Sequence, residues 1–152
     1  MRLCDYLDES RIFLGLEAGE KNALFAQALG QLEESDLVRD TGQVLRDLEL
    51  REEIMSTGIG EGVAIPHAQS SGVLQMHLVF LRPSTPLDFD AVDGRPVDLI
   101  FLILGPEEQG SDHVKILARI SRLIHGEPLR KKLREAGSPA EVLSAIRSHE
   151  ES

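Results

Sequence analysis

The apolar run PVDLIFLIL at residues 96–104 places the strongest limit on how this chain can fold. The run is too short for a transmembrane helix, which takes about 20 apolar residues. It is rich in β-branched and aliphatic side chains, as are strands that are buried on both faces of a sheet. We therefore expect residues 96–104 to form a central strand.

Helices and strands are also predicted before this run. Apolar residues that fall on one face indicate a helix over residues 17–32. A second helix is expected to begin with Thr41 as its cap and to end near residue 54. Strand composition marks residues 63–65 and 76–82.

Three more helices are predicted after the run. Ser111 or Asp112 is expected to cap a helix that ends near residue 125. A short basic helix should follow from Pro128 to about residue 136. Ser138 and Glu141 have the spacing of a capping box at the start of a last helix. Because helices and strands alternate, we expect an α/β sandwich with helices on both faces of one sheet.

Composition indicates one domain over residues 1–152 with an aliphatic core, since hydrophobic residues make up 41% of the chain and aromatic residues 4%. The 16 basic and 26 acidic residues give a net charge of −10, which disfavours nucleic acid as a partner. One basic cluster stands out, and we interpret it as a solvated helix face, with phosphate or partner contact as the alternative. It consists of Arg130, Lys131, Lys132 and Arg134.

The single cysteine, Cys4, excludes an intramolecular disulfide framework and fits a reducing compartment. No segment has the length and hydrophobicity of a membrane span, and the acidic residues of the first 16 positions are unlike a signal peptide. We therefore expect a cytoplasmic protein without membrane insertion.

Residues 51–68, REEIMSTGIGEGVAIPHA, contain the strongest candidate for chemistry, His67. Its ring follows a proline that restricts the backbone, and a neutral imidazole is a nucleophile near physiological pH. A phosphoryl group on this ring needs donors for three oxygens. Arginine, hydroxyl and glycine backbone N–H groups are donors of the right types. The candidates are Arg51, Ser56, Thr57, Gly60 and Gly62. The alternative is a structural histidine that ends a strand at a tight turn.

His113 is the second candidate, at the predicted start of the helix after the apolar strand. Either its ring is exposed to water, or it reaches over the edge of the sheet towards His67, where the helix N-terminus favours anions.

Other kinds of site have no support in the sequence. There is no H-E-x-x-H motif or paired Cys-His spacing for a metal, and we predict no metal and no cofactor. His113 and His125 are separated by 12 residues, which rotates them about 120° apart on one helix. Nucleotide-binding loops and the G-x-S-x-G elbow of serine hydrolases are also absent. His77 and His149 are expected to be structural or exposed.

The segment from Arg51 to His67 resembles the active-site signature of the fructose/mannitol-type (type 2) enzyme IIA domains of the bacterial phosphotransferase system. The resemblance extends over the whole chain, through the apolar strand and His113. It implies a single mixed β-sheet flanked by helices on both faces. It also implies that His67 accepts a phosphoryl group from a histidine of the carrier HPr or its nitrogen-branch counterpart NPr. Arg51 and His113 then assist the phosphohistidine, and Ser56 and Thr57 occupy the hydroxyl positions of the signature.

Within that family, the sequence favours the nitrogen-related regulatory branch, with a sugar-specific transport enzyme IIA as the alternative. The phosphoryl group would pass to a cysteine of an enzyme IIB domain or act as a regulatory signal. A function of another class is a binding module whose contacts with regulatory target proteins depend on phosphorylation of His67. A purely structural homologue is disfavoured because Arg51, His67 and His113 are all present.

Overall fold

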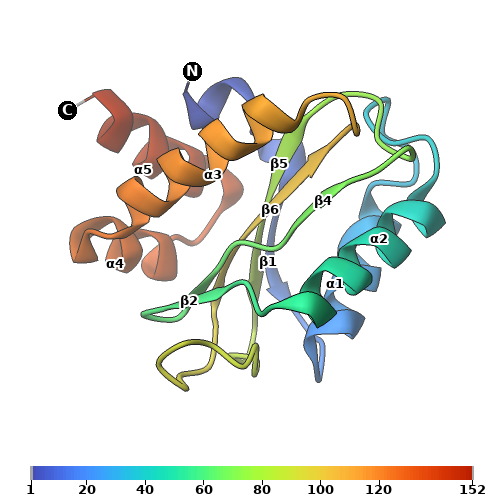
Figure 1. Cartoon of the computed structure of the whole chain (residues 1–152). Coiled ribbons are helices and arrows are strands. Elements are labelled where there is room, and N and C mark those ends of the chain that lie inside the picture. The colour runs from blue at the N-terminus through green and yellow to red at the C-terminus, as the bar shows by residue number, and fades with distance from the viewer. Residues whose placement is uncertain (1, 152) are drawn as a thin grey trace.

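The central strand of the sheet lies in the apolar run in a computed structural model, which describes residues 2–151 (Figure 1). It begins at Leu99, three residues later than predicted. Strand β6 (Leu99–Gly105) is buried along its whole length. Antiparallel β5 (His77–Pro83) pairs with it on one side, and the short parallel strands β3 (Val63–Ala64) and β4 (His67–Gln69) pair with it on the other. Parallel β1 (Ile12–Leu16) and antiparallel β2 (Gly58–Gly60) lie at the two edges, in the order β1-β5-β6-β3-β2.

Helices cover both faces of this mixed sheet, as predicted (Figure 1). One face is covered by α1 (Lys21–Gln31) and α2 (Thr41–Ile54). The other is covered by α3 (Gly110–Ile124), α4 (Glu127–Glu135) and α5 (Pro139–Glu151), with the 3₁₀ turn η1 (Leu3–Asp5) beside them. A second 3₁₀ turn, η2 (Glu9–Arg11), leads into β1. No helix among the described residues has the length and apolar character to span a membrane.

Strand β6 supplies side chains to two separate cores, since successive residues of a strand point to opposite faces of the sheet. Leu99, Phe101 and Ile103 belong to the core beneath α3, α4 and α5. The alternate residues of β6, Ile100 and Leu102, belong to the core beneath α1 and α2. This double burial explains why the run contains so few polar residues.

Two predicted helix caps were wrong. Asp40 caps α2 by accepting a hydrogen bond from the backbone N–H of Gln43 at 3.1 Å, and Thr41 is the first residue inside the helix. Helix α3 begins at Gly110 after Gln109, which makes no side-chain capping bond, so Ser111 and Asp112 lie inside the first turn. The cap of the last helix was right in position, because the Ser138 hydroxyl accepts from the N–H of Glu141 at 3.2 Å.

Three strands were not predicted, namely β1, β2 and β4. Strand β1 occupies residues just before the predicted helix 17–32, which begins at Lys21 with Glu20 as its cap. The basic cluster also needs correction. Arg130 is buried and donates to the carbonyl oxygens of Ile124 and His125, so only part of the cluster is a solvated face.

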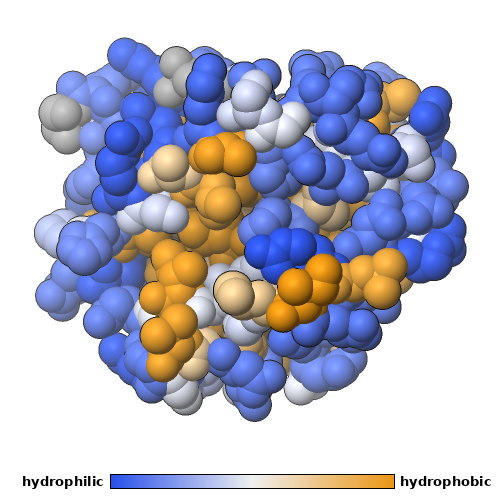
Figure 2. All heavy atoms as spheres, viewed as in Figure 1, coloured by the Kyte–Doolittle hydropathy of each residue, from blue (hydrophilic) through white to orange (hydrophobic). Residues whose placement is uncertain are grey.

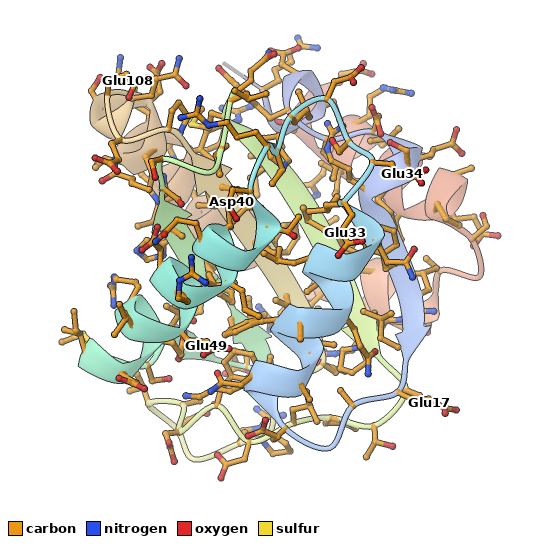
Figure 3. The ribbon with its side chains drawn as sticks, turned by 90° about the vertical axis from the view of Figure 1, so that its right-hand side faces the viewer. Glu17, Glu33, Glu34, Asp40, Glu49 and Glu108 are labelled. Atoms are coloured by element: carbon orange, nitrogen blue, oxygen red, sulfur yellow. The ribbon has the colours of Figure 1, made fainter. Side chains whose placement is uncertain are left out.

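Several acidic residues lie on α2 and in the loops at the ends of α1 and α2. Figure 3 shows carboxylates on α2 and on the loops that flank α1 and α2, pointing away from the sheet. The labelled residues are Glu17, Glu33, Glu34, Asp40, Glu49 and Glu108. An anionic ligand would meet repulsion on this side of the molecule.

Candidate functional site

An open cleft of about 650 Å³ lies where α2, β4 and the start of α3 meet. Helix α2 contributes Asp47, Leu50, Arg51 and Ile54, strand β4 contributes His67, Ala68 and Gln69, and α3 contributes Gly110, His113, Val114 and Leu117. Figure 2 shows hydrophobic side chains around the centre of this face, between α3 and the end of α2. The cleft therefore combines a few polar groups with an apolar surround.

His67 is the first residue of β4 and is partly buried in the cleft. Its Nδ1 lies 2.9 Å from the backbone carbonyl oxygen of Ile65. A carbonyl oxygen only accepts hydrogen bonds, so Nδ1 carries the hydrogen and the neutral ring keeps its lone pair on Nε2. Burial lowers the pKa of His67, the Ile65 carbonyl partly offsets this effect, and the charge of Arg51 lowers the pKa further. The arrangement favours a neutral ring with a nucleophilic Nε2.

His113 lies in the first turn of α3 and is 5% exposed. The centroid of its ring is 5.1 Å from that of His67, with an angle of 64° between the rings, so the two predicted histidines do meet. Burial, followed by repulsion from His67 and Arg51, lowers the pKa of His113 to about 4. Within residues 2–151, neither ring nitrogen of His113 has a hydrogen-bond partner. A neutral His113 thus has an N–H that can donate to a bound group.

Arg51 lies in the last turn of α2 and lines the same cleft. Its Nη1 donates to the carbonyl oxygen of Met55 at 3.2 Å. A guanidinium has five N–H donors, so others remain for an anion. Because the N-terminus of α3 adds partial positive charge, the cleft suits a negatively charged group beside a neutral imidazole.

The other predicted phosphate-binding residues do not line the cleft. The Ser56 hydroxyl donates to the carbonyl oxygen of Phe89, and the Thr57 hydroxyl donates to Glu52 Oε1 at 2.6 Å. Gly60 and Gly62 flank the turn between β2 and β3, where Gly60, Glu61 and Gly62 have φ angles of +99°, +57° and +77°. Of the predicted site residues, the structure brings Arg51, His67 and His113 together in the cleft.

The sequence reasoning missed Glu52, which is 4% exposed in the last turn of α2. Its carboxylate accepts from the N–H and hydroxyl of Thr57 and pairs with Lys21. A signal for it was available, since Val44, Leu48 and Glu52 are spaced four residues apart on the buried face of one helix. A carboxylate at an apolar position of such a pattern indicates a buried, partnered charge.

A family model and several known proteins match this chain over most of its length. The model of the family described as "Phosphoenolpyruvate-dependent sugar phosphotransferase system, EIIA 2" matches residues 5–149. The nitrogen regulatory protein of Pseudomonas aeruginosa is 34% identical over 146 residues, which are 96% of this chain and 94% of that protein. The fructose-specific EIIABC component of Bacillus subtilis is 32% identical over 99% of this chain, which spans only 24% of that protein.

Solved structures agree in fold. The nitrogen regulatory protein IIA-Ntr of Neisseria meningitidis aligns with a TM-score of 0.86 at 38% identity, covering 94% of this chain and 97% of that one. Enzyme IIA mannitol of Escherichia coli, in complex with phosphorylated enzyme IIB mannitol, aligns with a TM-score of 0.79 at 22% identity. That alignment covers 93% of this chain and 97% of that one and supports the fold alone.

Proposed function

The chain belongs to the EIIA type-2 family of the phosphoenolpyruvate-dependent sugar phosphotransferase system, and we propose that it is a phosphoryl carrier that is phosphorylated on Nε2 of His67. The observation that carries this proposal is the hydrogen bond from Nδ1 to the Ile65 carbonyl oxygen, because it leaves the lone pair on Nε2. The position of the ring beside Arg51 and His113 supports the same function.

The proposed reaction is an in-line transfer from a phosphohistidine of the donor protein. The lone pair of Nε2 forms a bond to phosphorus while the bond between phosphorus and the donor nitrogen breaks. A donor ring that is protonated on its second nitrogen leaves as neutral imidazole. The positive charge that develops on His67 is stabilised by the Ile65 carbonyl, which accepts the Nδ1 hydrogen bond. The balance requires no ATP, metal or other cofactor.

Arg51 and His113 stabilise the transferred group in this proposal. The Arg51 guanidinium offsets charge on the phosphoryl oxygens, and an N–H of His113 donates to one of them. The neutral state of His113 fits this role, since its proton need not be removed or added before transfer. The rate gain comes from groups that are already oriented before the donor arrives.

The apolar rim of the cleft is the proposed docking surface for protein partners. Leu50, Ile54 and Val114 are 59%, 80% and 64% exposed and surround a cleft that is lined by the reactive ring. Exposed apolar residues in one patch are typical of protein-protein contacts. The proposed donor is HPr or NPr, and the proposed acceptor is a cysteine of an enzyme IIB domain or a regulatory target. Transfer would take place in the cytoplasm, where phosphoenolpyruvate is available.

A regulatory role is a second candidate, favoured by the match to the P. aeruginosa nitrogen regulatory protein over nearly the full length of both chains. Phosphorylation would add a charge of about −2 at pH 7 beside the apolar rim and so change which proteins bind there. If target binding is the primary function, a His67→Ala variant will still bind the target of the unphosphorylated protein.

Intact mass measurement tests the proposed function. The protein is incubated with phosphoenolpyruvate, enzyme I and either HPr or NPr. We expect one acid-labile phosphoryl group on the wild-type protein and none on His67→Ala. No mass gain with either carrier would refute the carrier function, and the faster of the two carriers identifies the branch.

A further inference from the structure

Glu52 is a buried carboxylate directly after Arg51 in the last turn of α2. Its Oε2 accepts from the backbone N–H of Thr57 at 3.0 Å, and its Oε1 accepts from the Thr57 hydroxyl at 2.6 Å. Lys21 Nζ of α1 lies 3.2 Å from Oε2 and balances the charge. Burial of a carboxylate is unfavourable unless hydrogen bonds and an opposite charge offset the loss of water, and these three contacts hold the Glu52 carboxylate in one position.

Thr57 continues this series of hydrogen bonds towards His67. It is 6% exposed, and its carbonyl oxygen accepts from the backbone N–H of Ile65 at 3.0 Å. The carbonyl oxygen of the same Ile65 accepts from Nδ1 of His67 at 2.9 Å. Thr57 is therefore linked, through the backbone of Ile65, to the carbonyl oxygen that selects the tautomer of His67.

We propose that Glu52 and Thr57 are positioning residues for phosphoryl transfer to His67. Their two hydrogen bonds join the end of α2, which carries Arg51, to Thr57. The bond from the Ile65 N–H to the Thr57 carbonyl oxygen continues this link to the segment between β3 and β4, next to His67. The guanidinium and the nucleophilic ring are thereby set relative to each other before a donor binds. This inference rests on the proposed function, and it adds residues that touch neither the donor nor the reacting atoms.

Glu150 of α5 provides a matched control. It is also a buried carboxylate, since its side chain is 1% exposed. It also accepts two backbone hydrogen bonds, from the N–H groups of Leu3 and Cys4, and pairs with Arg119 at 2.7 Å. None of these residues lines the cleft. The Glu150→Gln variant therefore reproduces the loss of a buried charge without affecting the position of His67.

Transfer kinetics form the first part of the test. Glu52→Gln and Glu150→Gln should lose similar amounts of stability, but only Glu52→Gln should transfer more slowly. Thr57→Val removes the hydroxyl and keeps the backbone N–H, and we expect kcat to fall by about tenfold with little change in KM for the donor. Thr57→Ser restores the hydroxyl and should recover most of the rate. If Thr57→Val does not fold, the two glutamine variants and Thr57→Ser still give the comparison.

The tautomer of His67 forms the second part, measured by ¹⁵N NMR of the ring in the unphosphorylated protein. We expect the wild type to carry hydrogen on Nδ1, and Glu52→Gln and Thr57→Val to show a mixture of tautomers. The inference would be overturned if Glu52→Gln transferred the phosphoryl group no more slowly than Glu150→Gln. It would also be overturned if Glu52→Gln and Thr57→Val kept the wild-type tautomer of His67. If the wild type is never phosphorylated, the proposed function fails instead, and the tautomer still tests the positioning role.

Discussion

The two histidines of the cleft share an environment that keeps both rings neutral. Burial is the largest cause of the lowered pKa in each, and the positive charge of Arg51 adds to it. A neutral His67 is the reactive form, and a neutral His113 retains an N–H to donate. The same arginine that disfavours protonation of the rings attracts the phosphoryl oxygens, so both effects promote transfer.

Replacement of Arg51 tests its role at the residue scale. We expect Arg51→Gln to slow phosphorylation of His67 by roughly a hundredfold, the typical effect of removing one donor that stabilises a transition state. The variant also loses the exposed hydrogen bond from Arg51 to the Met55 carbonyl oxygen, which should change the free energy of unfolding little. Arg46→Gln is the control, since Arg46 is exposed on the same helix outside the cleft. Equal transfer rates in the two variants would contradict the role of Arg51.

His77 should make the folded protein sensitive to acid. It is 1% exposed, and burial lowers its pKa to about 4 from an ordinary value of 6.5. Between these values the unfolded chain binds a proton that the folded protein does not, so stability falls as the pH falls. The full shift corresponds to about 3 kcal/mol.

Urea unfolding between pH 7 and pH 4 measures this effect. We expect the free energy of unfolding to decrease less on acidification in His77→Gln than in the wild type. His125→Gln, at an exposed position, should follow the wild type. The same acid dependence in all three proteins would show that His77 is not responsible.

At the scale of elements, the β2–β3 turn depends on Gly62. Its φ of +77° is unfavourable for other residues, and a Cβ atom there would lie 2.8 Å from Asp98 Oδ1, which the side chain of Arg134 also contacts. We expect Gly62→Ala to destabilise the protein by about 1–3 kcal/mol in denaturant titration.

Gly94→Ala is the control for this change. Gly94 also has a positive φ, of +72°, but a Cβ atom there would meet nothing within 4 Å. Its loss of stability should therefore be smaller. If the two variants lose equal amounts of stability, the close approach of the new Cβ atom to the side chains of Asp98 and Arg134 does not destabilise the protein.

Long elements with a repeated apolar pattern could be predicted from the sequence. Helix α2 has apolar residues repeated on its buried face, and strand β6 is a continuous apolar run because both of its faces are buried. Strands β2 and β4 have three residues each, too few for a pattern. The partner of β4 is also distant in the sequence, since His67 pairs with Ile103 of β6. Helix α3 lacks a side-chain cap, so the residue types at its start gave a wrong boundary.

The same distinction applies to the cleft. Arg51 and His67 were found because they lie in one local signature, and His113 because it begins a helix after the central strand. The directions of the Ser56 and Thr57 hydroxyls could not be found in this way. Phe89, 33 residues away, accepts from Ser56, and the Glu52 carboxylate that accepts from Thr57 is buried beside Lys21 of another helix.

At the scale of the whole molecule, acidic residues and the apolar rim of the cleft lie on different parts of the surface. The net charge is −10, and carboxylates lie on α2 and in the loops that flank α1 and α2 (Figure 3). The apolar rim of the cleft lies on a different face (Figure 2). An anionic partner is therefore repelled by the acidic residues and can make apolar contacts at the rim of the cleft.

A charge on the rim should weaken docking of the donor without changing the chemical step. We expect Ile54→Glu to raise KM for the phosphorylated donor by about tenfold, with kcat nearly unchanged. Val92→Glu is the control, since Val92 is 89% exposed and does not line the cleft. If both variants raise KM equally, net charge rather than the rim controls docking.

The identity of the phosphorylated atom can be read by ³¹P and ¹⁵N NMR of the protein labelled in its histidines and phosphorylated by its donor. The hydrogen bond between Nδ1 and the Ile65 carbonyl leads us to expect a single phosphoryl group on Nε2 of His67. Phosphorus bonded to Nδ1 of that ring, or to any other residue, would contradict the function proposed for the cleft.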